Sequence, residues 1–172
     1  MRLTPLVSIM ALAASALADG HAITDAMAKI NTQTADLGST VRSWRGDLLG
    51  ALPITIKSTM LLQQIKAASR MADQSANLTT KEALAVAVAT TDLGKTVQAT
   101  LRTIIDTKPK FDKLIILSPV VLLNLELEQD ATEDFSAKIV GKVPTGLQGI
   151  AQNLIKPIDE AFAAAIDKYR IF

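Results

Sequence analysis

Apolar residues recur at helical spacing along most of the chain and divide it into five segments. The first segment carries a stripe with alternating spacings of four and three residues, formed by Ile23, Met27, Ile30, Thr34, Leu37, Val41, Trp44 and Leu48. This spacing predicts a helix with one buried face, and Gly46 and Gly50 mark its expected end. Because the pattern stops after one helix length, it favours a bundle over a long coiled coil.

The second and third segments carry recognisable start and stop signals. Pro53 suits the first turn of a second helix, whose apolar stripe is Ile54, Leu61, Ile65, Ala68 and Ala72. Thr79 and Glu82 have the spacing of a capping box, which opens a third helix. That helix is expected to end near Thr107, because Pro109 pushes the preceding residue out of the helical region. Apolar residues occupy two of its faces, so we expect it to lie centrally in the bundle.

The remaining segments predict two more helices. After a turn or loop over 111–117, Ser118 is expected as the N-cap and Pro119 as the first residue of a fourth helix, which Gly141 and Pro144 end. Thr145 and Gln148 resemble a second capping box. The fifth stripe is Leu147, Ala151, Leu154, Ile158, Phe162, Ala165 and Tyr169, and Pro157 within it should kink or divide the helix. With no convincing strand, the sequence predicts an all-α five-helix bundle.

The N-terminus has the features of a cleaved secretory signal peptide. Arg2 supplies the positive charge, residues 6–14 are mostly apolar, and Ala16 and Ala18 fit the cleavage site. The apolar run is too short for a membrane anchor, which needs about 20 residues. We therefore expect residues 1–18 to be removed and residues 19–172 to form one secreted domain with no transmembrane span.

Composition narrows the classes of partner. Removing residues 1–18 takes away one of the 18 basic residues and none of the 17 acidic residues, so the formal net charge falls from +1 to zero. Such a chain has no electrostatic preference for nucleic acid or anionic membranes. The sequence contains no cysteine and few aromatic residues, so its stability depends on aliphatic packing.

The sequence offers little for catalysis or for a cofactor. His21 is the only histidine and lies near the expected mature N-terminus, which argues against a catalytic triad. No metal or nucleotide motif is present, so we expect no cofactor, no metal and no enzymatic activity. Three acidic pairs, Glu126 with Glu128, Glu133 with Asp134 and Asp159 with Glu160, are interpreted as solvated helix faces. Asn77-Leu78-Thr79 is a candidate N-glycosylation site.

The most apolar stretch comprises residues 114–125, where ten of the twelve are apolar. It fits a fully buried helix start. The alternative is a segment that lines a cavity or faces an apolar partner, since a small bundle rarely buries an all-apolar helix completely. Trp44, the single tryptophan, is interpreted as part of the core.

Several blocks in order resemble the fungal hydrophobic surface-binding protein A family, also known as the cell wall galactomannoprotein or Mp1-type family. They are Leu52-Pro53-Ile54, Lys108-Pro109-Lys110-Phe111-Asp112-Lys113, Leu117-Ser118-Pro119-Val120-Val121-Leu122, Lys142-Val143-Pro144, Ile158-Asp159-Glu160-Ala161-Phe162 and Ala165-Ile166-Asp167. The resemblance implies a secreted or cell-wall-associated five-helix bundle. Some members enclose a long-chain fatty acid, and others adsorb to hydrophobic surfaces alongside secreted hydrolases. The Ser/Thr-rich tail of some members is missing, so covalent attachment to the wall is not expected.

Two hypotheses follow for the function. The first is a non-catalytic carrier of a fatty acid or similar lipid, with an apolar cavity formed by Leu61, Ile65, Val88, Leu101, Ile105, Phe111, Leu123, Leu127, Phe135, Leu154 and Phe162. Candidate residues for holding the ligand's head group are Ser58, Thr91 and Ser118. The second is an interaction protein that presents residues 114–125 to a hydrophobic surface and recruits a hydrolase there.

Overall fold

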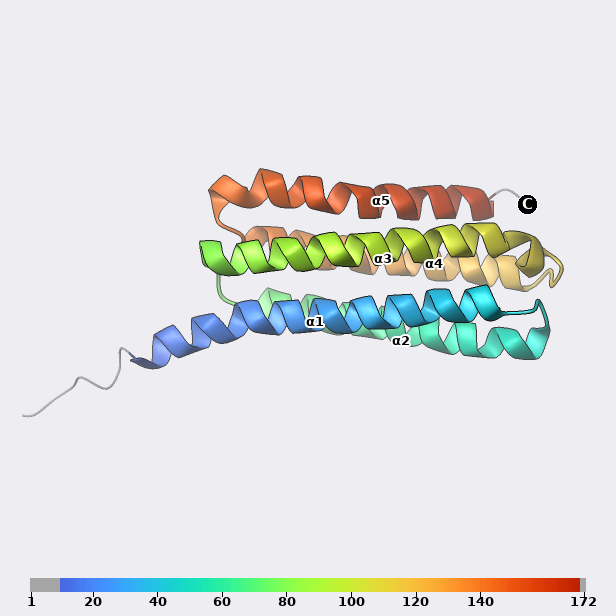
Figure 1. The fold of residues 1–172 in the computed structure, drawn as a ribbon, viewed down its shortest axis with the longest axis horizontal. Coiled ribbons are helices and arrows are strands. Elements are labelled where there is room, and N and C mark those ends of the chain that lie inside the picture. The colour runs from blue at the N-terminus through green and yellow to red at the C-terminus, as the bar shows by residue number, and fades with distance from the viewer. Residues whose placement is uncertain (1–9, 171–172) are drawn as a thin grey trace, which may run out of the picture.

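Five long helices run along a common axis (Figure 1). The structure, a computed structural model, describes the backbone of residues 10–170 and the side chains of residues 20–170. Residues 1–9 of the predicted signal peptide therefore lie outside the described residues. The elements are α1 (Met10–Ser43), α2 (Leu48–Gln74), α3 (Thr80–Asp112), α4 (Leu117–Lys142), the short 3₁₀ helix η1 (Thr145–Leu147) and α5 (Gln148–Arg170). The prediction of an all-α five-helix bundle is confirmed.

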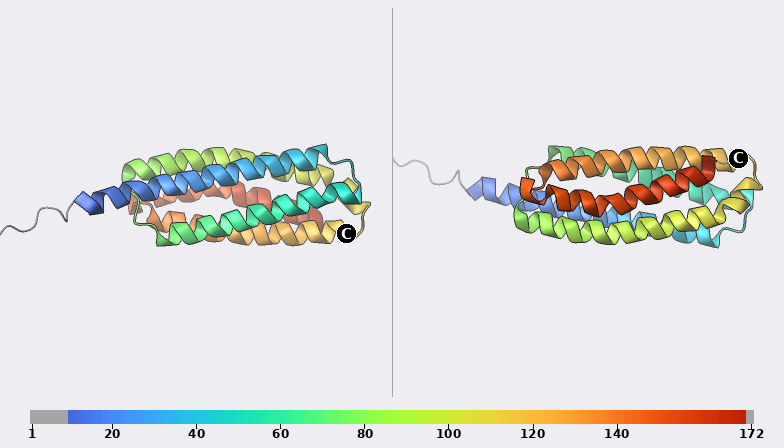
Figure 2. Two further views of the ribbon diagram at one scale, coloured as in Figure 1. Left: turned by 90° about the horizontal axis from the view of Figure 1, so that it is seen from below. Right: turned by 90° about the horizontal axis from the view of Figure 1, so that it is seen from above.

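The helices form a closed ring. Helix α1 packs against α2 and α3, α2 against α4, α4 against α5, and α5 against α3, with only slight contact between α3 and α4. Figures 1 and 2 show the α1–α2 and α3–α4 turns together at one end of the bundle. Helix α3 thus forms one wall of the ring, with two main neighbours, instead of lying at its centre as expected. Among the apolar residues of α3, Leu84 and Val88 are exposed.

The predicted stripes meet inside this ring. In the first stripe, each residue from Ile23 to Trp44 is buried, and in the second stripe all five residues are buried. In the fifth stripe, the last four residues are buried, namely Ile158, Phe162, Ala165 and Tyr169. Leu48 differs, because α1 ends at Ser43 and Leu48 begins α2, where it is exposed. Gly46 in the turn has φ +92°, a left-handed conformation that favours glycine. Asp47 then caps α2 by accepting a hydrogen bond from the Gly50 N–H at 2.6 Å.

Prolines do not set the helix boundaries that the sequence predicted. Pro53, Pro109 and Pro157 all lie inside helices. Each proline removes one backbone hydrogen bond, but tertiary packing maintains the helix: Lys108 and Phe111 are buried on either side of Pro109. The predicted start of α2 and end of α3 were therefore wrong. Helix α5 is not divided at Pro157 and curves along its length (Figure 2).

Of the three predicted caps, one is confirmed. Thr79 and Glu82 form both bonds of the capping box, with the Thr79 N–H donating to Glu82 at 2.8 Å and the Glu82 N–H to Thr79 at 3.3 Å. Ser118 is not an N-cap, because α4 begins at Leu117 and the Ser118 hydroxyl donates to Asp112 at 2.6 Å. Thr145 is not an N-cap either, because it is the first residue of the 3₁₀ helix η1. Pro144 occupies the N-cap position there and forms no side-chain hydrogen bond. Gly141 lies inside α4, which ends at Lys142.

Candidate ligand-binding site

An apolar pocket, here called the central pocket, lies inside the ring and is lined by residues from all five helices. Five of the residues predicted to form a cavity wall converge on it, namely Leu61, Ile65, Leu101, Phe135 and Phe162. Helix α1 contributes Ile30, Thr34 and Leu37 to the wall. The space open to the centres of water molecules is about 30 Å³. The ring arrangement, which no single helix pattern reveals, creates this pocket.

A second pocket, here called the end pocket, adjoins the central one. Leu37, Ile104 and Glu128 line both. The end pocket also contains Ser58 and Phe111 and has room of about 40 Å³, measured in the same way. Its wall includes Val120, which is 39% exposed, so it opens at the surface where α2 and α4 begin.

Aromatic side chains support the inner side of the end pocket. The rings of Trp44 and Phe111 lie 4.4 Å apart, and those of Phe111 and Tyr169 meet edge to face at 6.3 Å. The Trp44 indole donates to the Asp47 carbonyl at 2.8 Å, and the Tyr169 hydroxyl donates to the Ile104 carbonyl at 2.9 Å. Trp44 thus packs in the core behind Phe111, as predicted, and lines neither pocket.

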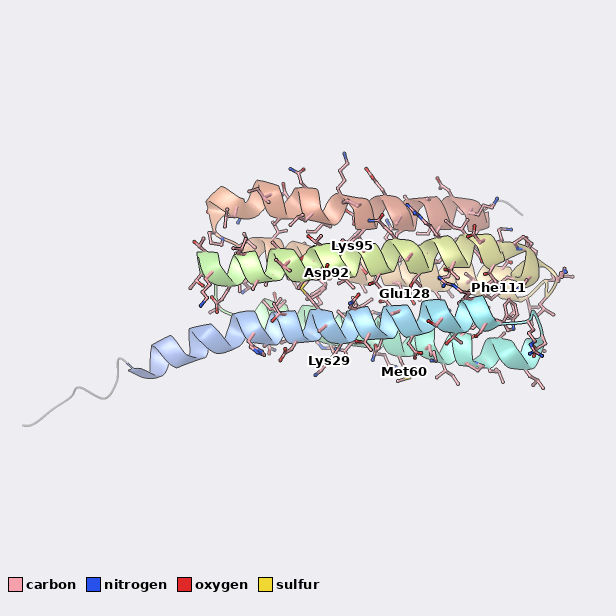
Figure 3. All side chains as sticks on the ribbon, viewed as in Figure 1. Lys29, Met60, Asp92, Lys95, Phe111 and Glu128 are labelled. Atoms are coloured by element: carbon pink, nitrogen blue, oxygen red, sulfur yellow. The ribbon has the colours of Figure 1, made fainter. Side chains whose placement is uncertain are left out.

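Glu128 places a carboxyl group between the two pockets. Its side chain lies in the interior of the bundle (Figure 3) and is 4% exposed. The Ser58 hydroxyl donates to its Oε1 at 2.7 Å. Burial raises the pKa of the Glu128 carboxyl to about 7, although the hydrogen bond from Ser58 acts in the opposite direction.

The prediction that Glu128 belongs to a solvated acidic face was wrong. Sequence reasoning grouped it with Glu126, which is partly exposed and pairs with Arg170 at 3.0 Å. A usable signal existed in the spacing, because Leu125, Glu128 and Phe135 lie three and seven residues apart and share the buried face of α4.

The other predicted site residues lie elsewhere. Leu154 lines a separate apolar pocket of about 100 Å³ at the opposite end, between α3, α4 and α5. Ile105 borders a separate groove between α3 and α5 with Pro157, and Leu127 is half-buried and lines none of these pockets. Val88, Leu123 and Thr91 are exposed. Ser118 is buried but is bonded to Asp112 outside both pockets. The structure therefore does not bring these seven residues into the two adjoining pockets.

One end of the bundle carries an exposed apolar surface, here called the apolar rim. It consists of Leu48, Leu49, Leu52, Ile56, Ile115, Ile116, Val120 and Leu123. These residues come from the starts of α2 and α4 and from the α3–α4 turn, around the mouth of the end pocket. Within the stretch 114–125, Leu117, Val121 and Leu125 line the pocket while Ile115 is 85% exposed. The stretch is thus not a fully buried helix start.

The described part of the chain was compared with three requirements: a histidine placed for catalysis, a group of metal ligands and a membrane-spanning helix. His21 is exposed and lies 3.0 Å from Asp25. Residues 20–170 hold no group of three or more side chains placed to bind a metal ion. Among the described helices, none combines the length and apolarity needed to cross a membrane. The mostly apolar walls of the central and end pockets suit noncovalent binding of an apolar molecule.

Fold and site together define a helical bundle that surrounds apolar pockets. The family model of hydrophobic surface binding protein A matches residues 20–141, and the chain belongs to this family. No curated protein sequence matches the chain.

Three solved structures share the fold. A crystal structure of Afmp4p in complex with palmitic acid is 23% identical, with a TM-score of 0.84 over 87% of this chain and 99% of that one. Ligand-binding domain 1 of the Penicillium marneffei MP1 protein, complexed with arachidonic acids, is 17% identical, with a TM-score of 0.83 over 88% and 98%. Domain 2 of the same protein, complexed with multiple arachidonic acids, is 19% identical, with a TM-score of 0.82 over 88% and 96%.

Proposed function

We propose that this protein is a secreted, non-catalytic carrier that holds a long-chain fatty acid or a similar lipid between its helices. The observation that carries the proposal is the pair of adjoining apolar pockets inside the ring, which open to the surface between α2 and α4. The similar fold of proteins complexed with palmitic and arachidonic acids supports the same function.

The bundle must widen to take up such a ligand. The space open to the centres of water molecules is about 40 Å³ in the end pocket and about 30 Å³ in the central pocket, whereas pockets that hold a ligand usually measure about 300–1,000 Å³. The α1–α2 and α3–α4 turns flank the pocket mouth. We therefore expect α2 and α4 to separate there when the alkyl chain enters.

Chain length is the sharpest test of the carrier function. Each methylene group that becomes buried contributes about 0.8 kcal/mol, or roughly fourfold in affinity. Delipidated protein should bind saturated fatty acids more tightly with each added carbon until the pockets are full. Trp44 reports binding by fluorescence, because it stacks on Phe111 of the end pocket.

A pair of matched variants locates the binding site. Ile65→Phe adds bulk to the central pocket and should weaken binding, whereas Met60→Phe places the same ring at an exposed position of α2 outside the apolar rim. If the delipidated wild type takes up no fatty acid, and organic extraction of the secreted protein yields no lipid, the carrier proposal fails.

The apolar rim supports a second candidate function, adsorption to a hydrophobic surface with recruitment of a secreted hydrolase. Leu49→Asp and Ile115→Asp place charges on the rim at residues 78% and 85% exposed. Both variants should adsorb less to polystyrene or wax. Val88→Asp, which introduces the same charge at an exposed apolar residue outside the rim, is the control. Equal adsorption by all four proteins would rule out the rim as the adsorbing surface.

Noncovalent association with the cell wall and glycosylation at Asn77 belong to the same proposal. An extracellular or wall-associated site agrees with the family and with the predicted signal peptide. Asn77 is exposed in the segment between α2 and α3, where a glycan would not disturb the core.

A further inference from the structure

Hydroxyl groups in the two pockets have already donated their protons to the protein. Ser58 donates to Glu128 Oε1 at 2.7 Å. The threonine hydroxyls donate to backbone carbonyl oxygens, as Thr34 to Ile30 at 2.8 Å, Thr55 to Ala51 at 3.3 Å, Thr100 to Thr34 at 3.0 Å and Thr132 to Glu128 at 2.7 Å. None of these five groups has a proton left to offer a ligand.

Glu128 has the opposite property. Ser58 occupies Oε1, and Oε2 has no hydrogen bond among the described residues, although the side chain is only 4% exposed. Glu128 is also the one charged residue in the two pocket walls, to which all five helices contribute. Charged groups on the packed helices pair elsewhere, as Asp36 with Lys57, Lys108 with Asp112 and Asp134 with Lys138. When Glu128 is ionised, the interior thus presents a free acceptor at its Oε2 atom.

The pocket walls thus offer a free acceptor but no free hydroxyl donor. This difference determines which kind of polar group at the end of a ligand fits against Glu128. A fatty carboxylate has only acceptor atoms and would meet a second negative charge at low dielectric. An O–H group instead donates to Oε2 and satisfies both partners. We infer that Glu128 selects, within the proposed lipid site, long-chain ligands whose polar end carries an O–H donor, such as a long-chain alcohol or a protonated fatty acid, over fatty carboxylates. This inference rests on the proposed carrier function.

Asn124 provides the competing arrangement. It lies one helical turn before Glu128, lines the end pocket and is half-buried. Its amide has donors for a carboxylate held at the pocket mouth. In that arrangement the alkyl chain passes Glu128, and the identity of residue 128 matters little for head-group preference.

The test compares dodecan-1-ol with dodecanoate, which share a chain length and differ in the polar end. Binding to delipidated full-length protein is measured at pH 8, because burial raises the pKa of Glu128 to about 7 and the carboxyl is then ionised. Wild type should bind the alcohol more tightly than the acid. Glu128→Gln, which supplies an amide donor, should strengthen dodecanoate binding about tenfold or more and change alcohol binding far less.

A control variant and the wild-type comparison together make the test decisive. Glu133→Gln removes an exposed carboxylate from the same helix and should leave both affinities unchanged. The wild-type comparison needs no variant, so it stands even if Glu128→Gln folds poorly. If wild type prefers dodecanoate, and Asn124→Leu abolishes that binding while Glu128→Gln does not alter it, the inference is overturned and the carrier function survives. If neither ligand binds wild type, the carrier function fails and the inference fails with it.

Discussion

At the scale of single residues, Lys108 and Glu128 are the two charged side chains that the described core buries. Lys108 is compensated, since its ammonium lies 2.9 Å from Asp112 and 5.6 Å from the centre of the Tyr169 ring. The Ser118 hydroxyl and the Lys108 ammonium hold the pKa of Asp112 below its ordinary value. Glu128 has no cation, so its ionisation is unfavourable in the folded protein.

Stability should therefore depend on the protonation of Glu128. Its pKa is raised from 4.5 to about 7 on folding, so its favourable contribution is fully present below pH 4.5 and is lost as the pH rises through 7. At about 1.4 kcal/mol per pKa unit, the full loss is of the order of 3 kcal/mol. Denaturant unfolding between pH 5 and 8 should show this loss in the wild type and a much smaller one in Glu128→Gln. The same pH dependence in both proteins would contradict the assignment.

At the scale of elements, local capping fixes helix starts where side chains bond the first turn, as at Asp47 and Thr79. Helix ends depend more on tertiary contacts. Helix α3 continues past Pro109 because Phe111 packs against Trp44, and the Ser118 hydroxyl bonds Asp112 in the last turn of α3.

The cap and the candidate glycosylation site share Thr79, and two substitutions separate them. Thr79→Ala removes both the capping box and the sequon, and should lower the free energy of unfolding by about 1 kcal/mol. Asn77→Gln removes only the sequon at an exposed position, and should leave that free energy unchanged. Intact mass of the secreted protein should show a glycan that both variants lose. A stable Thr79→Ala protein would show that the cap contributes little.

At the scale of the whole molecule, ring closure places apolar faces of all five helices around one interior and leaves the apolar rim at the end where the pockets open. Gly20 is buried at the opposite end, where a Cβ atom in its place would lie 2.6 Å from the Glu82 side chain. A side chain at residue 20 would therefore force α1 away from the start of α3.

Cleavage after Ala18 should leave the bundle intact. We expect the protein recovered from the medium of an expressing fungal host to begin at Asp19, as N-terminal sequencing or intact mass would show. Its thermal unfolding midpoint should match that of a refolded 19–172 chain. A retained leader, or a mature N-terminus beyond Gly20, would contradict the predicted signal peptide.

The apolar stripes and the start and stop signals by themselves determined the number of helices, and the stripes determined most of the buried faces, because both signals are local along the chain. The same holds for the Thr79–Glu82 cap, whose partners are three residues apart. Only the tertiary structure decided which helices are neighbours, that three prolines lie within helices, and that Glu128 faces a pocket while Val88 and Leu123 face solvent. These outcomes depend on contacts between residues distant in sequence, which the periodicity of one helix does not encode.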